Sequence, residues 1–378
     1  MTDSTELTAL TVDDATLPVI DLSGLFSGDP ADKAAVAQSL GRAARTSGFF
    51  YITGHGIDQA QIDATFAASK QFHEMPRSFK MKTWSGFTTH HRGYVPFEEN
   101  GSKFPQVINF NEAWDMSFEA PADHPDYLAG WRMTGPNVWP DLPGWKDTVS
   151  GYYDAIFNLG LRMLDALALE LGVPTEELTR HITCPTSQLR LLRYIENDMP
   201  QTKDVTGISA HSDFECFTIL CQGAPGLQVM NADDVWIEAP PIPGTFIVNI
   251  GDIFETWSGG QFKSTQHRVI NTGNERYSMP LFFGLDYDAV VEPLEKFRTP
   301  ETVAKYPPIK AGEHLMRMTA SAVVVLPEPD SPIKPTRTPL GICSESLLTA
   351  CTTPLAVGKS IERSVRSRAT SVIGKPPL

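Results

Sequence analysis

The sequence contains a short run, His211-Ser212-Asp213, whose residue types and spacing suit the binding of a metal ion. In an extended strand, residues i and i+2 point to the same face, so His211 and Asp213 can present an imidazole and a carboxylate to one cation. His267, further along the chain, offers a third ligand. Two histidines and one carboxylate, with open positions opposite, suit an O2-activating Fe(II) ion. A zinc hydrolase could use the same three residues, and a chance spacing would look the same.

A second pair of polar side chains, Arg276 and Ser278, follows His267. The two also share a strand face, and a guanidinium fork beside a hydroxyl is suited to binding a carboxylate. Arg276 introduces an otherwise apolar strand over residues 279–283, where an unpaired inward guanidinium would be costly. We therefore expect an anionic partner, which a dicarboxylate bound at the iron by its other end would supply. A surface ion pair is the alternative.

Alternating apolar residues predict strands throughout the region that carries these side chains. Several short strands separated by Gly, Pro and Asn turns are typical of a β-sandwich or a jelly roll. The predicted strands contain Leu189-Leu191-Arg193, Phe217-Ile219, Leu227-Val229, Phe246-Val248-Ile250 and Met279-Leu281-Phe283.

Helices are expected mainly in the first half of the chain. Asp29-Pro30 begins one helix that Gly48 ends, and Asp58 caps a second. The clearest helical periodicity covers residues 145–171 and ends at Gly172. Residues 76–144 are predicted to be long loops with short strands. The predicted fold class is therefore α+β, with N-terminal helices packed against one barrel-like β core.

Composition excludes several classes of protein. The chain has 378 residues, 41% of them hydrophobic, which argues against a disordered or collagen-like chain. A formal net charge of −14 would repel nucleic acid and anionic membranes, and no apolar run approaches the roughly 20 residues needed to span a bilayer. Five scattered cysteines do not form a disulfide framework. We expect a soluble, cytoplasmic protein with no nucleic-acid or membrane partner; oligomeric state is not readable.

Taken together, the motifs resemble the isopenicillin N synthase-like branch of the Fe(II)/2-oxoglutarate-dependent oxygenases. The resemblance covers roughly residues 17–320, and the order and spacing of the motifs agree with that family. Its most specific parts are His211-Ser212-Asp213, Pro225-Gly226-Leu227-Gln228-Val229, the run from Pro243 to Asp252, Ser264-Thr265-Gln266-His267-Arg268-Val269 and Arg276-Tyr277-Ser278. The N-terminal Leu17-Pro18-Val19-Ile20-Asp21 and the run from Gly48 to Gly56 also look like the family.

The resemblance implies a double-stranded β-helix (jelly-roll) core and six ligand-binding residues. Fe(II) would be held by His211, Asp213 and His267, and the co-substrate 2-oxoglutarate by Arg276, Ser278 and Tyr194. It implies a dioxygenase that uses O2 to oxidise, typically to hydroxylate, a C–H bond of a small molecule, while 2-oxoglutarate is decarboxylated to succinate and CO2. Plant members have an Asn where this chain has Leu192, which puts that part of the co-substrate contact in doubt.

The resemblance also suggests a division of the chain. Residues 1–120 would form an N-terminal oxygenase region of helices, short strands and substrate loops, and residues 121–184 a helical linker segment that packs on the core. Residues 185–320 would be the Fe(II)/2-oxoglutarate dioxygenase jelly-roll core. Residues 321–378 are rich in Pro, Ser and Thr, lose all periodicity, and are expected to be an atypical low-order tail.

Two other functions remain open from the sequence. A family oxidase that closes rings or desaturates without 2-oxoglutarate has the same motifs, with the Arg and Ser holding the substrate's own carboxylate. A non-catalytic β-barrel binding protein with a vestigial site is the other alternative, although intact motifs argue against it. Arg92, Lys103 and Arg193 could pair with an acidic substrate, but solvation at the surface explains each of them as well.

Overall fold

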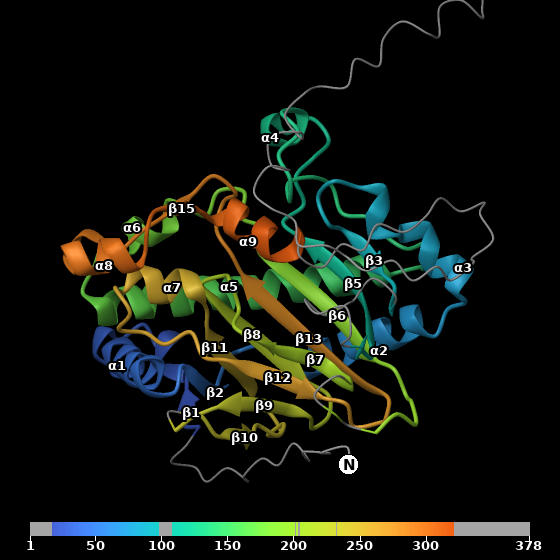
Figure 1. Ribbon diagram of the computed structural model, residues 1–378, viewed down its shortest axis with the longest axis horizontal. Helices are drawn as coiled ribbons and strands as arrows, with labels where there is room; N and C mark the ends of the chain where they lie inside the picture. The colour runs from blue at the N-terminus through green and yellow to red at the C-terminus, as the bar shows by residue number, and fades with distance from the viewer. Residues whose placement is uncertain (1–16, 98–107, 201, 203–204, 232, 321–378) are drawn as a thin grey trace, which may run out of the picture. The chain divides into compact units, whose positions relative to one another are not determined.

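A computed structural model describes residues 17–97, 108–200, 202, 205–231 and 233–320 of the chain (Figure 1). The expectation of a low-order tail over residues 321–378 lies outside these residues.

The strands of the described residues begin early in the chain and dominate its second half. In chain order they are β1 (Val19–Asp21), β2 (Phe49–Thr53), β3 (Gly93–Val95), β4 (Ile108–Asn109), β5 (Asn111–Ser117), β6 (Gln188–Tyr194), β7 (Val205–His211), β8 (Phe217–Gln222), β9 (Leu227–Met230), β10 (Trp236–Glu238), β11 (Phe246–Ile250), β12 (His267–Ile270), β13 (Arg276–Phe283), β14 (Val290–Val291) and β15 (Ile309–Lys310).

Two sheets form the core. The larger has the strand order β1-β2-β11-β8-β13-β6-β5-β3, and the smaller has the order β10-β9-β12-β7-β4. Most neighbouring strands are antiparallel and many are not consecutive in the chain, as in a jelly roll, where successive strands alternate between two facing sheets. Strands β1, β2, β3 and β5 come from the N-terminal part of the chain and extend the larger sheet at both ends.

The helices begin and end where local sequence signals place them. They are α1 (Pro30–Thr46), α2 (Gln59–His73), α3 (Arg77–Lys80), α4 (Pro125–Leu128), α5 (Trp145–Leu171), α6 (Thr175–Thr179), α7 (Asp252–Trp257), α8 (Pro300–Lys305) and α9 (Ala311–Ala320). The Asp29 and Asp58 side chains accept hydrogen bonds from the first turns of α1 and α2, and Gly172 ends α5 in the left-handed conformation that glycine favours. Among the described residues, no helix is both long and apolar enough to cross a lipid bilayer.

The larger sheet has two faces with different neighbours. Helices α1, α2 and α5 pack together on its outer face (Figure 1), where Leu189 and Leu191 of β6 are fully buried with them. The inner face turns towards the smaller sheet, and the apolar residues between the sheets form a separate inner cluster that includes Leu192, Tyr194 and Val269. The structure confirms the predicted α+β class with a jelly-roll core and N-terminal helices packed against it. Any side chain on the inner face therefore borders the space between the two sheets.

Candidate active site

His211, Asp213 and His267 come together at one end of the smaller sheet. His211 is the last residue of β7 and His267 the first of β12, and the two are register partners on neighbouring antiparallel strands. Their rings lie 4.2 Å apart between centroids. Asp213 follows β7 directly, and its Oδ1 lies 3.5 Å from His211 Nε2 and 3.7 Å from His267 Nε2. One nitrogen or oxygen of each residue therefore points to a common space.

A hydrogen bond at Nδ1 orients each of the two imidazole rings. His211 Nδ1 lies 2.8 Å from the carbonyl oxygen of Ser209, and His267 Nδ1 lies 3.3 Å from that of Thr265. A backbone carbonyl can only accept, so each Nδ1 carries the proton and each Nε2 keeps its lone pair. This is the arrangement of metal-binding histidines, whose remote N–H is fixed by a neighbouring acceptor.

The carboxylate of Asp213 is held in a similar way. Its Oδ2 accepts a hydrogen bond of 2.7 Å from Asn249 Nδ2 and another from the Thr218 hydroxyl, so Oδ1 alone faces the two histidines. Burial by itself would raise the pKa of Asp213, but His267 and His211 outweigh burial and hold this pKa below its usual range. Asp213 is thus an anion at neutral pH.

The three ligand atoms fit a single divalent cation. Asp213 Oδ1 lies slightly farther from each Nε2 than the roughly 3 Å expected between adjacent ligands about 2.1 Å from an ion, and all three atoms lie within 4.8 Å of one another. A small movement of each side chain would close that difference. Two neutral imidazoles and one carboxylate, all contributed from one side, match the ligand set of non-haem Fe(II) and leave positions for other ligands. These three residues could hold iron.

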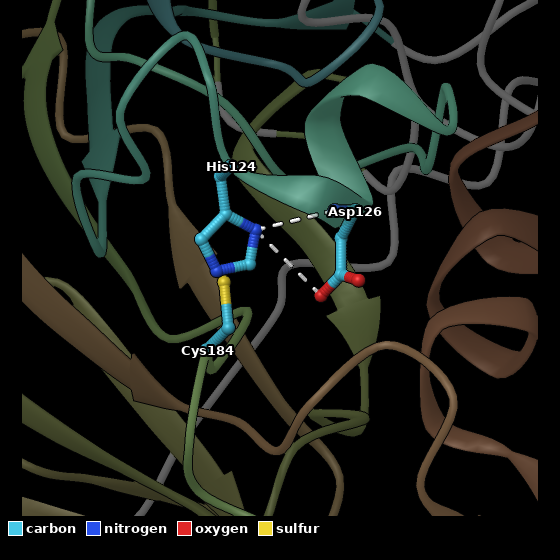
Figure 2. Close-up of side chains that lie close together, drawn as sticks. All are labelled: His124, Asp126 and Cys184. Carbon is cyan, nitrogen blue, oxygen red and sulfur yellow. Dashed lines mark hydrogen bonds and ion pairs between the residues drawn. The ribbon is translucent and has the colours of Figure 1, made fainter.

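A second group of potential metal ligands, His124, Asp126 and Cys184, lies at α4. Figure 2 shows Asp126 facing one ring nitrogen of His124 and the sulfur of Cys184 beside the other. However, His124 Nδ1 accepts a 3.3 Å hydrogen bond from the Asp126 amide and so caps α4. Burial, aided by the charges of Asp126 and Asp286, raises the pKa of the Cys184 thiol to about 11. His124 Nδ1 is thus occupied as a helix cap, and the Cys184 thiol would have to lose its proton to bind a metal.

Arg276, Ser278 and Tyr194 lie together on the inner face of the larger sheet. Arg276 and Tyr194 are register partners on β13 and β6, and the guanidinium lies 4.1 Å from the centre of the Tyr194 ring. Ser278, two residues along β13, has its hydroxyl 3.5 Å from that of Tyr194. Leu192, which stands where plant members have Asn, is the register partner of Ser278 and belongs to the inner cluster.

The Arg276 guanidinium has no anionic partner among the residues that the structure describes. Only 4% of the residue is exposed, yet its Nε and Nη1 make no hydrogen bond, and no carboxylate of the described residues pairs with it. A buried guanidinium without a counter-ion is costly unless a ligand supplies the negative charge. A Cβ atom at position 226 would lie only 2.5 Å from Arg276 Nη1, so Gly226 leaves room for the guanidinium. This arrangement fits the distal carboxylate of a bound dicarboxylic acid.

Glu215, which the sequence analysis did not single out, lies beside the proposed iron ligand Asp213. It follows Asp213 closely and only 8% of it is exposed. Burial, together with the charge of Asp213, raises the pKa of Glu215 to about 8, so it is largely protonated at neutral pH. The position of Glu215 two residues after Asp213 was the only sequence signal for it, and nothing in the sequence indicated its burial.

The basic residues considered for an acidic substrate have different surroundings. Arg193 faces the outer side of the larger sheet and is tied to Glu112 and Glu275. Arg92 is fully buried, and its Nη atoms bind the carbonyl oxygens of His90 and Met133. Neither guanidinium is free for a substrate. Lys103 lies outside the described residues.

Comparison with known proteins decides the family. Residues 17–142 match the N-terminal region of the family described as non-haem dioxygenase in morphine synthesis, and residues 186–285 match the 2OG-Fe(II) oxygenase superfamily. A 2-oxoglutarate-Fe(II) type oxidoreductase of Emericella nidulans is 33% identical over 77% of this chain and 86% of its own length. The chain belongs to the Fe(II)/2-oxoglutarate-dependent oxygenases. As a member, it is an oxidoreductase that uses Fe(II), 2-oxoglutarate and O2.

Other similar proteins in this oxygenase family have more specific names. A homoarginine-6-hydroxylase of Oryza sativa subsp. japonica is 33% identical over 82% of this chain and 98% of its own. Among solved structures, a Neurospora crassa protein in complex with alpha-KG and thymine superposes with a TM-score of 0.69, at 26% identity over 84% of this chain and all of that one. A 2OG-Fe(II) oxygenase family protein of Caulobacter crescentus gives a TM-score of 0.70 at 29% identity, over 80% of this chain and 98% of its own.

Proposed function

We propose that this oxygenase hydroxylates a C–H bond of a small organic substrate at the site between the two sheets. His211, Asp213 and His267 would hold Fe(II), and Arg276, Ser278 and Tyr194 would hold the distal carboxylate of 2-oxoglutarate. The observation that carries the proposal is the buried Arg276 guanidinium, which has no counter-ion in the described part of the chain and lies on the inner face that the His-Asp-His group borders.

The side chains divide the work of such a reaction. When bound, iron and 2-oxoglutarate together supply the oxidising chemistry, with 2-oxoglutarate converted to succinate and CO2. The Nδ1 hydrogen bonds of His211 and His267 fix the direction of each Nε2, and Asn249 leaves Asp213 Oδ1 as the carboxylate ligand. The apolar inner cluster excludes water from the reacting groups.

A small-molecule substrate is supported by the relatives. The homoarginine-6-hydroxylase is named for an amino-acid substrate, and the Neurospora crassa structure contains thymine. We further propose that residues 185–320 are the catalytic core, that residues 1–120 supply substrate loops, and that residues 121–184 pack on that core. The three cysteines of the described residues are free thiols, which supports our proposal of a cytoplasmic protein. We propose no nucleic-acid or membrane partner.

Titration of the iron-loaded protein with 2-oxoglutarate under anaerobic conditions tests the proposed function. A visible metal-to-ligand charge-transfer band should appear as 2-oxoglutarate chelates the iron. The Arg276→Ala variant should need at least tenfold more 2-oxoglutarate to reach half of the band intensity, because it loses a charge-assisted bond to the distal carboxylate.

Arg193→Ala is the matched control for Arg276→Ala. It removes a guanidinium from the outer face of the same sheet, so it should leave the 2-oxoglutarate titration unchanged. If iron binds but no band appears at any 2-oxoglutarate concentration, the co-substrate role is wrong and the protein is an oxidase of another kind. Arg276 would then be examined as an anchor for the substrate.

A further inference from the structure

Arg190 and Asp115 form an ion pair on two neighbouring strands of the larger sheet, and only the Asp115 carboxylate is fully buried. They are register partners on β6 and β5. Arg190 Nε lies 2.8 Å from Asp115 Oδ1, and Arg190 Nη2 lies 3.0 Å from Asp115 Oδ2. Such a two-point pair fixes both the position and the plane of the guanidinium.

The pair faces the space between the sheets. Successive side chains of a strand alternate between faces, so Arg190 shares the inner face with Leu192 and Tyr194, while Leu189 and Leu191 are buried under the helices. Leu192 is the register partner of Ser278, which places Arg190 roughly 7 Å further along the same wall, at two residues of strand. Arg190 therefore lies on the inner face of the larger sheet, on the same strand as Tyr194 of the proposed co-substrate site.

The guanidinium of Arg190 keeps donors for a ligand. Its side chain is 28% exposed, whereas that of Asp115 is 4% exposed, although both point to the inner face of the sheet. Nε and Nη2 bind Asp115, and Nη1 has no acceptor among the residues that the structure describes. An inward side chain that stays partly exposed can be reached by a ligand in the space between the two sheets. Two N–H bonds of Nη1 are therefore directed at whatever occupies it.

Two carboxyl groups, Asp115 and the largely protonated Glu215, act on Arg190, and further guanidinium groups lie near this part of the wall. The charged groups that act most on His91 are Arg132, Asp115, Arg92 and Arg190, three guanidinium groups against one carboxylate. His91 touches the wall itself, because its carbonyl oxygen accepts a 3.2 Å hydrogen bond from Gln188 Nε2 on β6. The field of these groups favours an anion in front of Arg190.

We propose that Arg190, held in place by Asp115, determines substrate specificity by binding a carboxylate of the substrate. This inference rests on the proposed function, because it requires 2-oxoglutarate to occupy the Arg276 pocket while the substrate lies against β6 and β5. The substrate class is thus a small carboxylic acid, oriented by one charge-assisted contact.

The test uses pairs of probes that differ only in the anionic group: phenylacetate and phenylacetamide, octanoate and octanamide, and L-arginine and L-argininamide. Binding to the full-length protein is measured by calorimetry, anaerobically, with Fe(II) and saturating 2-oxoglutarate, so that the Arg276 pocket is already filled. The wild-type protein should bind at least one acid about tenfold or more tightly than its amide, as expected for one charge-assisted hydrogen bond.

The double variant R190Q/D115N should abolish this preference. Exchanging both partners avoids leaving a buried carboxylate unpaired, which could unfold the protein. The matched control is R193Q/E275Q, which removes an ion pair of the same kind from the opposite face of the same strand, where Arg193 is 24% exposed. The control should keep the preference for acids.

Each result bears on the proposal. It is overturned if no acid of the panel binds the wild-type protein more tightly than its amide, or if R190Q/D115N keeps the preference. Loss of the preference in R190Q/D115N but not in R193Q/E275Q supports it. The proposed function is judged separately by the charge-transfer band of the wild-type protein. A missing band contradicts the co-substrate role, whereas a normal band with an unchanged acid preference in R190Q/D115N contradicts only the role of Arg190.

Discussion

Asn249 donates a hydrogen bond of 2.7 Å to Asp213 Oδ2, from a strand that does not contain any of the three proposed iron ligands. Asn249 lies on β11 of the larger sheet, while His211 and His267 belong to the smaller one. The contact therefore joins the two sheets at the metal site. Asn249 and the Thr218 hydroxyl both donate to Oδ2, so Oδ1 is the carboxylate oxygen that remains for the ion.

Asn249→Leu should weaken iron binding by about 10- to 100-fold, because the Asp213 carboxylate loses a partner that orients it. The measurement is an anaerobic titration with Fe(II). Asn137→Leu is the control, since Asn137 is also buried and bonded, to the backbone of Ser117, but lies away from the iron ligands. It should lower stability while leaving the iron affinity unchanged. Equal effects of the two variants would show that Asn249 acts only on the fold.

Gly226→Ala should raise the 2-oxoglutarate concentration needed for half-saturation by about tenfold or more, with iron binding retained. The new Cβ would lie 2.5 Å from Arg276 Nη1 and would force the guanidinium out of line with the distal carboxylate. Gly226 also has a φ of +133°, so part of any effect reflects backbone strain.

Gly244→Ala separates strain from contact in that experiment. Gly244 has a φ of +73°, also in the region that favours glycine, but a Cβ there would meet no atom within 4 Å. It should lower the free energy of unfolding without changing the 2-oxoglutarate titration. If Gly226→Ala binds 2-oxoglutarate as well as the wild type, Arg276 does not hold its distal carboxylate in the observed position.

Lys80→Met should lower the free energy of unfolding by roughly 3 kcal/mol, because it leaves the Glu112 carboxylate buried with a lost partner. Lys80 Nζ lies 2.8 Å from both carboxylate oxygens of Glu112, and both side chains are almost fully buried. Adding Glu112→Gln should recover much of the loss, since the unpaired charge is then gone. Urea denaturation of the three proteins checks this; a double variant no more stable than Lys80→Met would contradict it.

Local signals in the sequence predict the helices and the outlines of the site. Caps such as Asp29 and Asp58 are local, and so is the period of α5, which is why these helices begin and end where expected. The His-Asp pair needs only strand alternation to share a face. The pairing of His267 with His211 depends on sheet register, which the family resemblance indicated and the spacing alone did not.

Strand β5 shows what could not be predicted. All seven of its residues are buried, including Asn111, Glu112, Asp115 and Ser117. A strand with so many polar residues does not show the alternation that indicates a buried face. Its carboxylates can be buried because their partners, Lys80 for Glu112 and Arg190 for Asp115, come from distant parts of the sequence. For the same reason the sequence analysis considered Arg193 and overlooked Arg190. Counting back two residues at a time from Tyr194 along β6 would have placed Arg190 on the inner face.

His73 should make the protein less stable in mild acid. It is buried on α2, and this burial, aided by Lys80 and Arg193, outweighs the opposing effects of Glu112 and the Ser69 carbonyl and lowers its pKa to about 4. An unfolded chain would bind a proton near pH 6.5, so the unfolded state binds more protons than the folded state between pH 4 and 6.5. The stability due to neutral His73 is therefore complete above pH 6.5 and is lost as the pH falls towards 4, by up to about 1.4 kcal/mol per pH unit.

His73→Gln cannot take up this proton, so its free energy of unfolding, measured in urea across this range, should fall less steeply with decreasing pH than that of the wild type. Parallel pH profiles would mean that His73 is protonated in the folded protein, with Glu112 as its counter-ion.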